Sequence, residues 1–547
     1  MAKSQKSRAS KLRYLSPRVV PLPGFETPFD QHLDKNNRWV KLAQLIPWDN
    51  IVNIYLSKLK NQKLGADSIN PRVAIGAMII KHMNDFSDRE TVLQIQENVY
   101  MQYFIGYSSF SNQAPFDASL FVEFRNRLSL DDINKINEKI VKIYQQSMDE
   151  SSKDGTIKND IVDHTVKPDE TLPAVDVPKQ DDEKQSVTVS SEEGKENVQP
   201  AKKVELRGTL IMDATVSPQE IAYPTDLDLL NESRQQCEKL IDGLMAYISE
   251  WTTIEIKKPR TYRKVARKQY LKIAQKKTRS RSEIRKGIRQ QLQYLKRNIK
   301  HLHWLLDQIE FIVFDKKAYK YFLVIQHLYD QQKTMYDTKT HSIENRIVSI
   351  HQPHVRPIKK GKKNSDTEFG AKIQASLMDG FVFIDELNWE AFNEGARLKL
   401  SVENYKRRMG CYPQKVLADK IYCTRENRNF LKEQGIELRA KPLGRPKALS
   451  NQVSPGERNP IEGKFGQAKR GYGLDKIRAK LASTSESWIS TIILVLNLVK
   501  LAGAAPYCLL VSIWDEYAKK CTLHFNFIEI FLTAAQPQSG KVVFKPT

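Results

Sequence analysis

The sequence predicts an α/β domain with a helical insertion, preceded by an all-α amino-terminal domain. Three observations support this fold class. Helix signals follow one another between residues 38 and 148, and strand-like runs alternate with helices from about residue 204 to 502. Between these regions, residues 151–200 contain 12 Asp and Glu side chains and no Phe, Trp or Tyr, so this stretch cannot bury enough apolar surface to fold.

The predicted domain boundaries follow these changes in composition. The chain has 547 residues, which is long enough for several domains. We expect a basic flexible arm over residues 1–37, a helical domain over 38–148, an acidic disordered linker over 149–203, an α/β domain over 204–502 with a basic helical insertion at about 230–340, and a carboxy-terminal extension over 503–547.

Short helices in series are predicted for residues 38–148. Asn70 followed by Pro71 has the N-cap and first-turn pattern of a helix start. Such a series suits a helix-turn-helix-like DNA reader, with Arg125 and Arg127 as contacts. An ordinary helical bundle with solvated arginines fits the same pattern equally well.

The α/β domain is predicted from alternating strands and helices. A strand over 209–213 leads to a turn at Ser217-Pro218 and then to a helix over 228–249. Acidic side chains at strand ends suit a site along the carboxyl edge of a sheet. The remaining predicted elements are strands at 368–377, 380–385, 415–419 and 436–441 and helices at 401–409 and 424–434.

The net charge of +23, with a pI near 9.5, favours a polyanionic partner, nucleic acid above all. Residues 257–300 carry 18 Lys and Arg against one acid, Glu283. We expect one or two long helices with a basic face there, continuing through an amphipathic helix at 302–336. A solvated charge run is the alternative, although repulsion among these cations weakens it. The predicted phosphate contacts in this segment include Arg263, Lys264, Arg267 and Lys268.

Several other function classes lack their sequence signals. The five cysteines contain no Cys-x-x-Cys pair, which disfavours a zinc site or a disulfide framework and favours a reducing cytosol. We find no Gly-x4-Gly-Lys-Ser/Thr loop and no His-Glu-x-x-His, which disfavours ATP-driven enzymes and zinc hydrolases. The sequence starts without a secretory signal, and polar residues and Pro506 interrupt the apolar stretch from Trp488 to Trp514, which favours a buried helix.

Three carboxylates are candidates for catalysis. Asp213 and Asp419 each close an apolar, strand-like run, and Glu462 opens a predicted helix. Converging carboxylates from distant segments can hold one or two Mg²⁺ or Mn²⁺ ions, and in a chain this basic the fitting substrate is a phosphodiester. Each acid also has a structural interpretation. Asp213 and Asp419 can stabilise turns, and Glu462 fits a capping box with Asn459 and Pro460.

Two cations flank Glu462 at helical spacing. Arg458 lies four residues before it and Lys469 seven residues after it, so all three lie near one face of a helix. We expect Arg458 to neutralise or position the carboxylate and Lys469 to reach a phosphate. Further phosphate contacts are predicted from a short basic run that contains Lys359, Lys360, Lys362 and Lys363.

These segments resemble the DDE transposases of bacterial insertion sequences. The resemblance lies in residues 210–234, in residues 416–428 and in a third block with the pattern Tyr-x2-Arg-x3-Glu-x6-Lys. Here that block is supplied by Arg458, Glu462 and Lys469, as described above. The chain departs from the pattern at the tyrosine position, where it has Pro455, so the role of that tyrosine cannot be carried over. Residues 38–148 are also similar to the helical amino-terminal domain of such transposases.

The resemblance implies an RNase H-like catalytic core, with the basic segment in an insertion between the first two acids. It also implies metal-dependent phosphoryl transfer on DNA, in which Asp213, Asp419 and Glu462 hold two Mg²⁺ (or Mn²⁺) ions. The implied partners are double-stranded terminal inverted repeats, a target DNA, and further copies of the chain in a homodimer or larger assembly. The expected location is the bacterial cytoplasm, at the nucleoid. Two alternatives are a catalytically inactive nucleic-acid-binding protein and a nuclease that cuts without joining.

Overall fold

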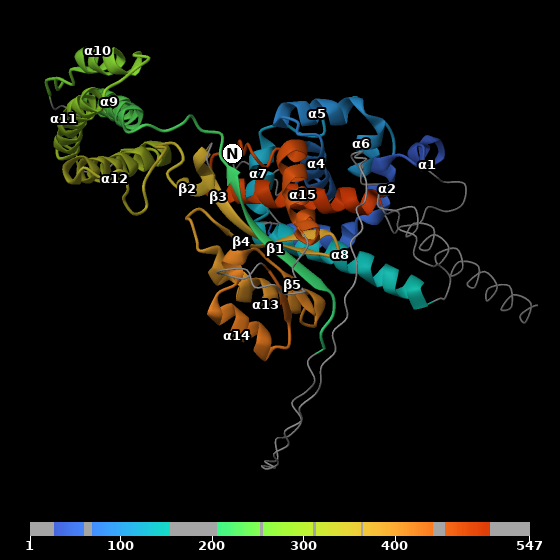
Figure 1. Cartoon of the computed structure of the whole chain (residues 1–547). Helices are drawn as coiled ribbons and strands as arrows, with labels where there is room; N and C mark the ends of the chain where they lie inside the picture. The colour runs from blue at the N-terminus through green and yellow to red at the C-terminus, as the bar shows by residue number, and fades with distance from the viewer. Residues whose placement is uncertain are drawn as a thin grey trace, which may run out of the picture.

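The computed structural model combines a helical amino-terminal region with a curled mixed sheet flanked by helices (Figure 1). This combination confirms the predicted mixture of an all-α region and an α/β region. The structure describes residues 27–58, 68–153, 205–251, 255–309, 313–362, 365–440 and 455–503.

Strand β1 (Thr209–Pro218) lies in the middle of the sheet. On one side it pairs antiparallel with β3 (Ser365–Met378), and on the other it pairs in parallel with β5 (Lys415–Leu417). Both edges of β1 are therefore occupied by backbone hydrogen bonds. The outer strands are β2 (Arg356–Lys362) and β4 (Phe381–Asn388), both antiparallel to β3, and β6 (Glu437–Arg439), parallel to β5.

Helices cover both faces of the sheet, and the alternation of side chains along β1 decides which helix each residue meets. Ile211 packs against a hydrophobic cluster formed with α15 (Pro455–Tyr472) and the helix Ala482–Gly503. Its neighbour Met212 belongs to another cluster, which contains buried residues of α13 (Leu398–Met409). The face of β1 that carries Ile211 is thus the face that α15 covers.

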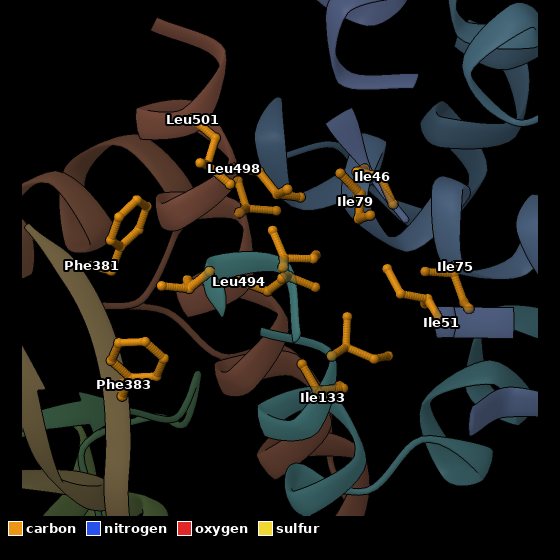
Figure 2. Close-up of a cluster of buried hydrophobic side chains, with 14 of the residues drawn as sticks. Ile46, Ile51, Ile75, Ile79, Ile133, Phe381, Phe383, Leu494, Leu498 and Leu501 are labelled. Carbon is orange, nitrogen blue, oxygen red and sulfur yellow. The ribbon is translucent and has the colours of Figure 1, made fainter. Parts of the chain in front are cut away.

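The amino-terminal helices share a hydrophobic core with the sheet region. Ile75 and Ile79 belong to the same buried cluster as Phe381 of β4 and Leu494 and Leu498 of the last described helix (Figure 2). Burial of this continuous apolar surface holds the two regions together. The helices are α1 (Pro28–His32), α2 (Arg38–Leu45), α3 (Trp48–Leu56), α4 (Pro71–Met83), α5 (Asp88–Glu97), α6 (Val99–Phe104), α7 (Leu120–Arg127) and α8 (Leu130–Lys153).

A buried hydrogen-bond network crosses the same junction. The side-chain amide of Asn497 donates to Asn137 Oδ1 of α8 at 2.9 Å and to the Val382 carbonyl oxygen of β4 at 2.8 Å. Its Oδ1 accepts from the Val382 N–H at 2.8 Å. Because buried polar groups need partners, this network fixes the positions of α8, β4 and the last helix relative to one another.

Between β1 and β2, the described residues form a lobe of four helices with its own hydrophobic core (Figure 1). The Ser280 side chain and Glu283 form a capping box at the start of α11. Within the lobe, the buried Arg234 donates to Glu238 at 2.5 Å and to Gln291 at 3.2 Å. The lobe occupies the stretch where an insertion is predicted. Its helices are α9 (Asp226–Trp251), α10 (Arg263–Ala274), α11 (Arg281–Leu306) and α12 (Lys316–Thr338).

The turn predicted at Ser217-Pro218 is wrong, because β1 continues through both residues. They pair with β3 at a position where that strand has Gly370. A Cβ atom at Gly370 would lie 2.0 Å from the Ser217 carbonyl oxygen, so only glycine allows the two backbones to approach this closely.

Other predicted boundaries need correction. The helix predicted over 302–336 is interrupted, because α11 ends at Leu306 and Asp315 caps a new helix by accepting from the Ala318 N–H. Part of the predicted flexible arm is helix α1, in which Phe29 is buried. The first residues of the predicted linker continue α8. The rest of that linker and the predicted extension beyond residue 503 lie outside the described residues.

One helix in the described part of the chain, Ala482–Gly503, is long and apolar enough to cross a membrane. Most of it is buried among the residues of the protein core. This agrees with the buried helix that the sequence predicts in this region.

We predict that Asn497→Ala lowers the free energy of unfolding by about 2–4 kcal/mol, because it leaves the buried Val382 N–H and Asn137 Oδ1 without this partner. Chemical denaturation followed by tryptophan fluorescence measures the effect. The matched control is Asn429→Ala on the exposed surface of α14 (Arg425–Glu433), where we expect a change within about 0.5 kcal/mol. Equal stability of the two variants would contradict the structural role of the network.

Candidate active site

The pairing of β1 with β5 brings Asp213 and Asp419 close together. Ile211 is paired with Leu417 in the parallel register. Asp213 lies two residues further along β1, and Asp419 lies two residues after Leu417, just beyond the end of β5. Because side chains alternate along a strand, both carboxylates fall on the face that Ile211 occupies. Asp213 was predicted at the end of its strand, but it lies in the strand interior, because β3 continues to pair with β1 opposite Ala375.

Helix α15 covers this face and adds Glu462 and Arg458 to the site. Arg458 Nη1 lies 3.0 Å from Asp419 Oδ1, and Nη2 lies 2.7 Å from Glu462 Oε1. The contact with Glu462 is the one predicted from the four-residue spacing. Arg458 also interacts electrostatically with Asp213. The guanidinium group is therefore the shared counter-charge of three carboxylates that come from distant segments of the sequence.

The interpretation of Glu462 as a helix cap is wrong. Helix α15 begins at Pro455, so Glu462 lies in the interior of the helix and Pro460 is inside the helix as well. A proline at that position forfeits one backbone hydrogen bond, but it does not end the helix here. The Glu462 carboxylate pairs with Arg458, and its side chain is 55% exposed.

Asp213 has an unusual electrostatic environment. Burial raises the pKa of its carboxyl to about 6, and the negative charges of Glu394 and Glu462 add to the rise. The Ala214 N–H, which donates to Asp213 Oδ1 at 2.9 Å, and the Arg458 guanidinium act in the opposite direction. Asp213 is thus a carboxylate that the folded chain stabilises incompletely, and additional positive charge beside it would be favourable.

The donor set fits a hard divalent cation, because it consists of carboxylate oxygens and includes the incompletely stabilised Asp213. In the described residues, however, no group of three or more His, Cys, Asp or Glu side chains is arranged as a metal centre. The Arg458 guanidinium lies between the Asp419 and Glu462 carboxylates and supplies positive charge there. Binding of a metal by all three acids therefore requires this group to move.

Residues that the sequence analysis did not select surround these acids. Tyr422 is buried at the end of the short helix that Asp419 caps, and its hydroxyl donates to Gln374 Oε1 at 2.9 Å. Burial and the nearby acids, Glu394 first among them, raise the pKa of Tyr422. Glu394 itself pairs with Lys372 at 2.8 Å. Tyr422 lies three residues after Asp419, so the sequence could have indicated it as a neighbour of the site. No sequence pattern connects Glu394 to the other acids.

The predicted phosphate contacts on α10 have different surroundings. Arg263 makes two hydrogen bonds of 2.9 Å to Asp242 of α9, so its charge is neutralised within the lobe. Lys264, Arg267 and Lys268 are exposed. These three residues line a surface pocket together with Leu271, Lys272 and Gln275.

The remaining predicted contacts are distributed over β2 and α15. Lys359 is exposed on β2, and Lys469 lies on α15, two turns beyond Glu462. Lys360 and Lys362 belong to β2, but the structure does not describe their side chains. Lys363 lies outside the described residues.

Arg125 does not fit the predicted role of a DNA contact, because it is buried. Its guanidinium donates to both carboxylate oxygens of Asp88, at 3.1 and 2.9 Å, and lies 5.2 Å from the ring centroid of Trp488. Arg127 is partly buried and donates to the Tyr55 hydroxyl at 2.9 Å. Both arginines stabilise the packing of α7, so they fit neither the predicted DNA contacts nor the solvated arginines of the alternative.

Two protein families match separate parts of the chain. Residues 27–127 match the family described as transposase domain DUF772, and residues 416–499 match the family described as transposase DDE domain. This chain carries the domains of a DDE-type transposase. The second match includes Asp419 and the segment of α15 that holds Arg458 and Glu462. The predicted resemblance to transposases of insertion sequences is therefore confirmed.

A curated relative of this chain is the uncharacterized protein ORF8 in the nfe locus of Rhizobium meliloti. It is 27% identical over 144 residues, which cover 26% of this chain and 68% of that protein. No solved structure matches the chain at a significant level.

We predict that Asp213→Asn stabilises the metal-free protein at neutral pH. The folded pKa of about 6 lies above the ordinary value of 3.8, so between these values the folded state binds more protons and stability falls as pH rises. At pH 7 the variant should be more stable by about 1–3 kcal/mol, and the difference should vanish near pH 4. Urea denaturation in EDTA measures this difference in the free energy of unfolding. The control is Asp475→Asn at an exposed position, which should leave the stability unchanged. An Asp213→Asn variant that is less stable than wild type at pH 7 would contradict the prediction.

Proposed function

We propose that this transposase cleaves DNA at the terminal inverted repeats of an insertion sequence and joins the ends to target DNA by metal-dependent phosphoryl transfer. The observation that carries the proposal is the convergence of Asp213, Asp419 and Glu462, from three distant segments, around one guanidinium group. A mixed sheet flanked by helices is also the layout that an RNase H-like core predicts, and we propose this fold for the sheet region.

Asp213, Asp419 and Glu462 would hold the metal. When bound, two Mg²⁺ or Mn²⁺ ions supply activation of water or of a DNA 3′-hydroxyl and stabilisation of charge on the leaving oxygen. The backbone pairing of β1 positions Asp213, and α15 presents Glu462 from above the sheet. No residue of the chain needs to form a covalent intermediate with DNA.

Cations near the acids would orient the DNA strand. Arg458 projects from α15 beside Asp419 and Glu462, and its planar guanidinium can bind a phosphate through two hydrogen bonds. Lys469 on the same helix would bind a phosphate further along the strand. Lys359, which is exposed on β2, would add a further phosphate contact.

The helical lobe would bind a more distant part of the duplex. Lys264, Lys268 and Lys272 lie at four-residue intervals on α10, so they form one exposed basic stripe. A stripe of this kind fits a phosphate backbone and carries no information about base sequence. Recognition of the terminal repeats would then involve other parts of the chain, including the amino-terminal helices.

The proposed reaction also sets expectations for assembly and location. Cutting and joining two DNA ends requires two active sites or one site used twice, which favours a homodimer or a larger assembly on DNA. We propose that the protein acts in the bacterial cytoplasm, at the nucleoid. These two expectations rest on the proposed reaction.

We predict that Asp213→Asn retains DNA binding and loses cleavage by more than about 100-fold. Loss of a residue that only supports a metal ligand already lowers activity by about 10–100-fold, and loss of a ligand itself should lower it further. The assay measures nicking of candidate terminal repeats with Mg²⁺ or Mn²⁺. The exposed Glu433→Gln on α14 serves as a control that should leave cleavage unchanged. Undiminished cleavage by the Asp213 variant would rule out the assignment. Products that are cut but never joined would favour a nuclease.

We predict that replacing Lys264, Lys268 and Lys272 together by Gln weakens binding to any duplex and reduces its salt dependence. Loss of three phosphate contacts should reduce the slope of log Kobs against log salt by up to about 2.7. The matched control replaces the exposed Lys316, Lys317 and Lys339 at the ends of α12. Equal slopes for the two triple variants would exclude the α10 stripe as a backbone contact.

A further inference from the structure

The guanidinium of Arg458 occupies the position of a shared positive charge among the three acids. Its two terminal nitrogens bind different carboxylates, Asp419 at 3.0 Å and Glu462 at 2.7 Å. Partial burial lowers the pKa of Arg458. The hydrogen bond to Glu462 and the charges of Asp213 and Asp419 outweigh this effect and hold the pKa above its ordinary value. The group therefore remains charged and directs that charge at the same oxygens that would bind a metal.

We propose that Arg458 is an internal substitute for the divalent cation, and that metal binding displaces it from Asp419 and Glu462. This inference rests on the proposed function, because it assumes that the three acids bind a metal. In the metal-free chain, Arg458 keeps the carboxylates together and limits their mutual repulsion. After metal binding, the released guanidinium becomes available to a DNA phosphate beside the site.

The exposure of these ion pairs shows that Arg458 binds Asp419 and Glu462 only weakly. The side chains of Arg458, Asp419 and Glu462 are 23%, 46% and 55% exposed, so water screens both contacts. Ion pairs of this kind change an equilibrium by at most about fivefold each. A divalent cation bound by converging carboxylates interacts more strongly with them, so displacement of Arg458 is favourable.

The chain contains a matched control for this arrangement. Arg439 of β6 also connects two carboxylates, with Nε 2.9 Å from Glu437 and Nη1 3.3 Å from Glu457, and Glu457 belongs to α15 as well. Its side chain is 34% exposed. Arg439 carries the same charge and binds the same helix, but it pairs with acids outside the proposed metal site. A change at Arg458 that is absent at Arg439 is therefore specific to the site.

The first experiment measures the accessibility of Arg458 in the full chain without DNA. Phenylglyoxal modifies free guanidinium groups, and mass spectrometry gives the rates at Arg458 and Arg439 in the same sample. We expect Mn²⁺ to accelerate modification of Arg458 by about 2–5-fold and to leave Arg439 unchanged. An unchanged or slower rate at Arg458 in saturating Mn²⁺ would overturn the proposal.

The second experiment measures Mn²⁺ affinity by electron paramagnetic resonance. Arg458→Gln removes the competing charge and should bind Mn²⁺ about 2–10-fold more tightly than wild type, whereas Arg439→Gln should remain within about twofold. Arg458→Lys keeps the charge but not the two-pronged contact, and its affinity should fall between those of wild type and Arg458→Gln. Weaker binding by Arg458→Gln would show that Arg458 assists the metal and would overturn the proposal.

The two levels of the argument fail in different ways. Suppose that Asp213→Asn abolishes Mn²⁺ binding, but Arg458 does not become more accessible and its replacement does not change the Mn²⁺ affinity. Then only the proposal that Arg458 stands in for the cation is wrong. If wild-type protein does not bind Mn²⁺, or if Asp213→Asn binds it equally well, the proposed metal function fails and the inference fails with it.

Discussion

The pairing of β1 on both edges is the constraint on which the site depends. β3 holds one edge through Pro218, whereas β5 holds the other edge only as far as Leu417. Because β5 ends there, the chain leaves the sheet at Asp419, directly beside the still-paired Asp213. A shift of β1 by one residue would turn Asp213 towards α13 and away from Glu462. The backbone register therefore determines whether Asp213 lies on the face of the sheet that α15 covers.

The amino-terminal helices support this arrangement from outside the sheet. Trp488, in the helix that shares a cluster with α15, lies 4.6 Å from the buried Lys81 ammonium and 5.2 Å from the Arg125 guanidinium, measured to its ring centroid. Both cations bind Asp88. Removing one partner from a buried group of charges typically costs about 3–5 kcal/mol. The stability of this distant junction thus contributes to holding the helical layer over the acids.

Much of the site could be predicted from local sequence, because Asp213 and Asp419 both follow apolar runs that form strands, and Arg458 and Glu462 have helical spacing. What could not be predicted depends on partners that are distant in sequence. The continuation of β1 requires Gly370, whose missing side chain admits the neighbouring backbone. The burial of Arg125 likewise requires Asp88 and Trp488. Pro460 suggested a helix start because the preceding turn of α15 has no distinctive signal.

The helical lobe is attached to the sheet at the end of the strand that carries Asp213. Arg346 and Gln332 both bind Asp226, the first residue of α9, and so join the entry and exit of the lobe. From this base, the 26 residues of α9 extend about 39 Å, slightly more than one turn of B-form DNA at about 34 Å. If the lobe binds DNA as proposed, a contact at the far end of α9 would therefore lie about one turn of the duplex away from the base of the lobe.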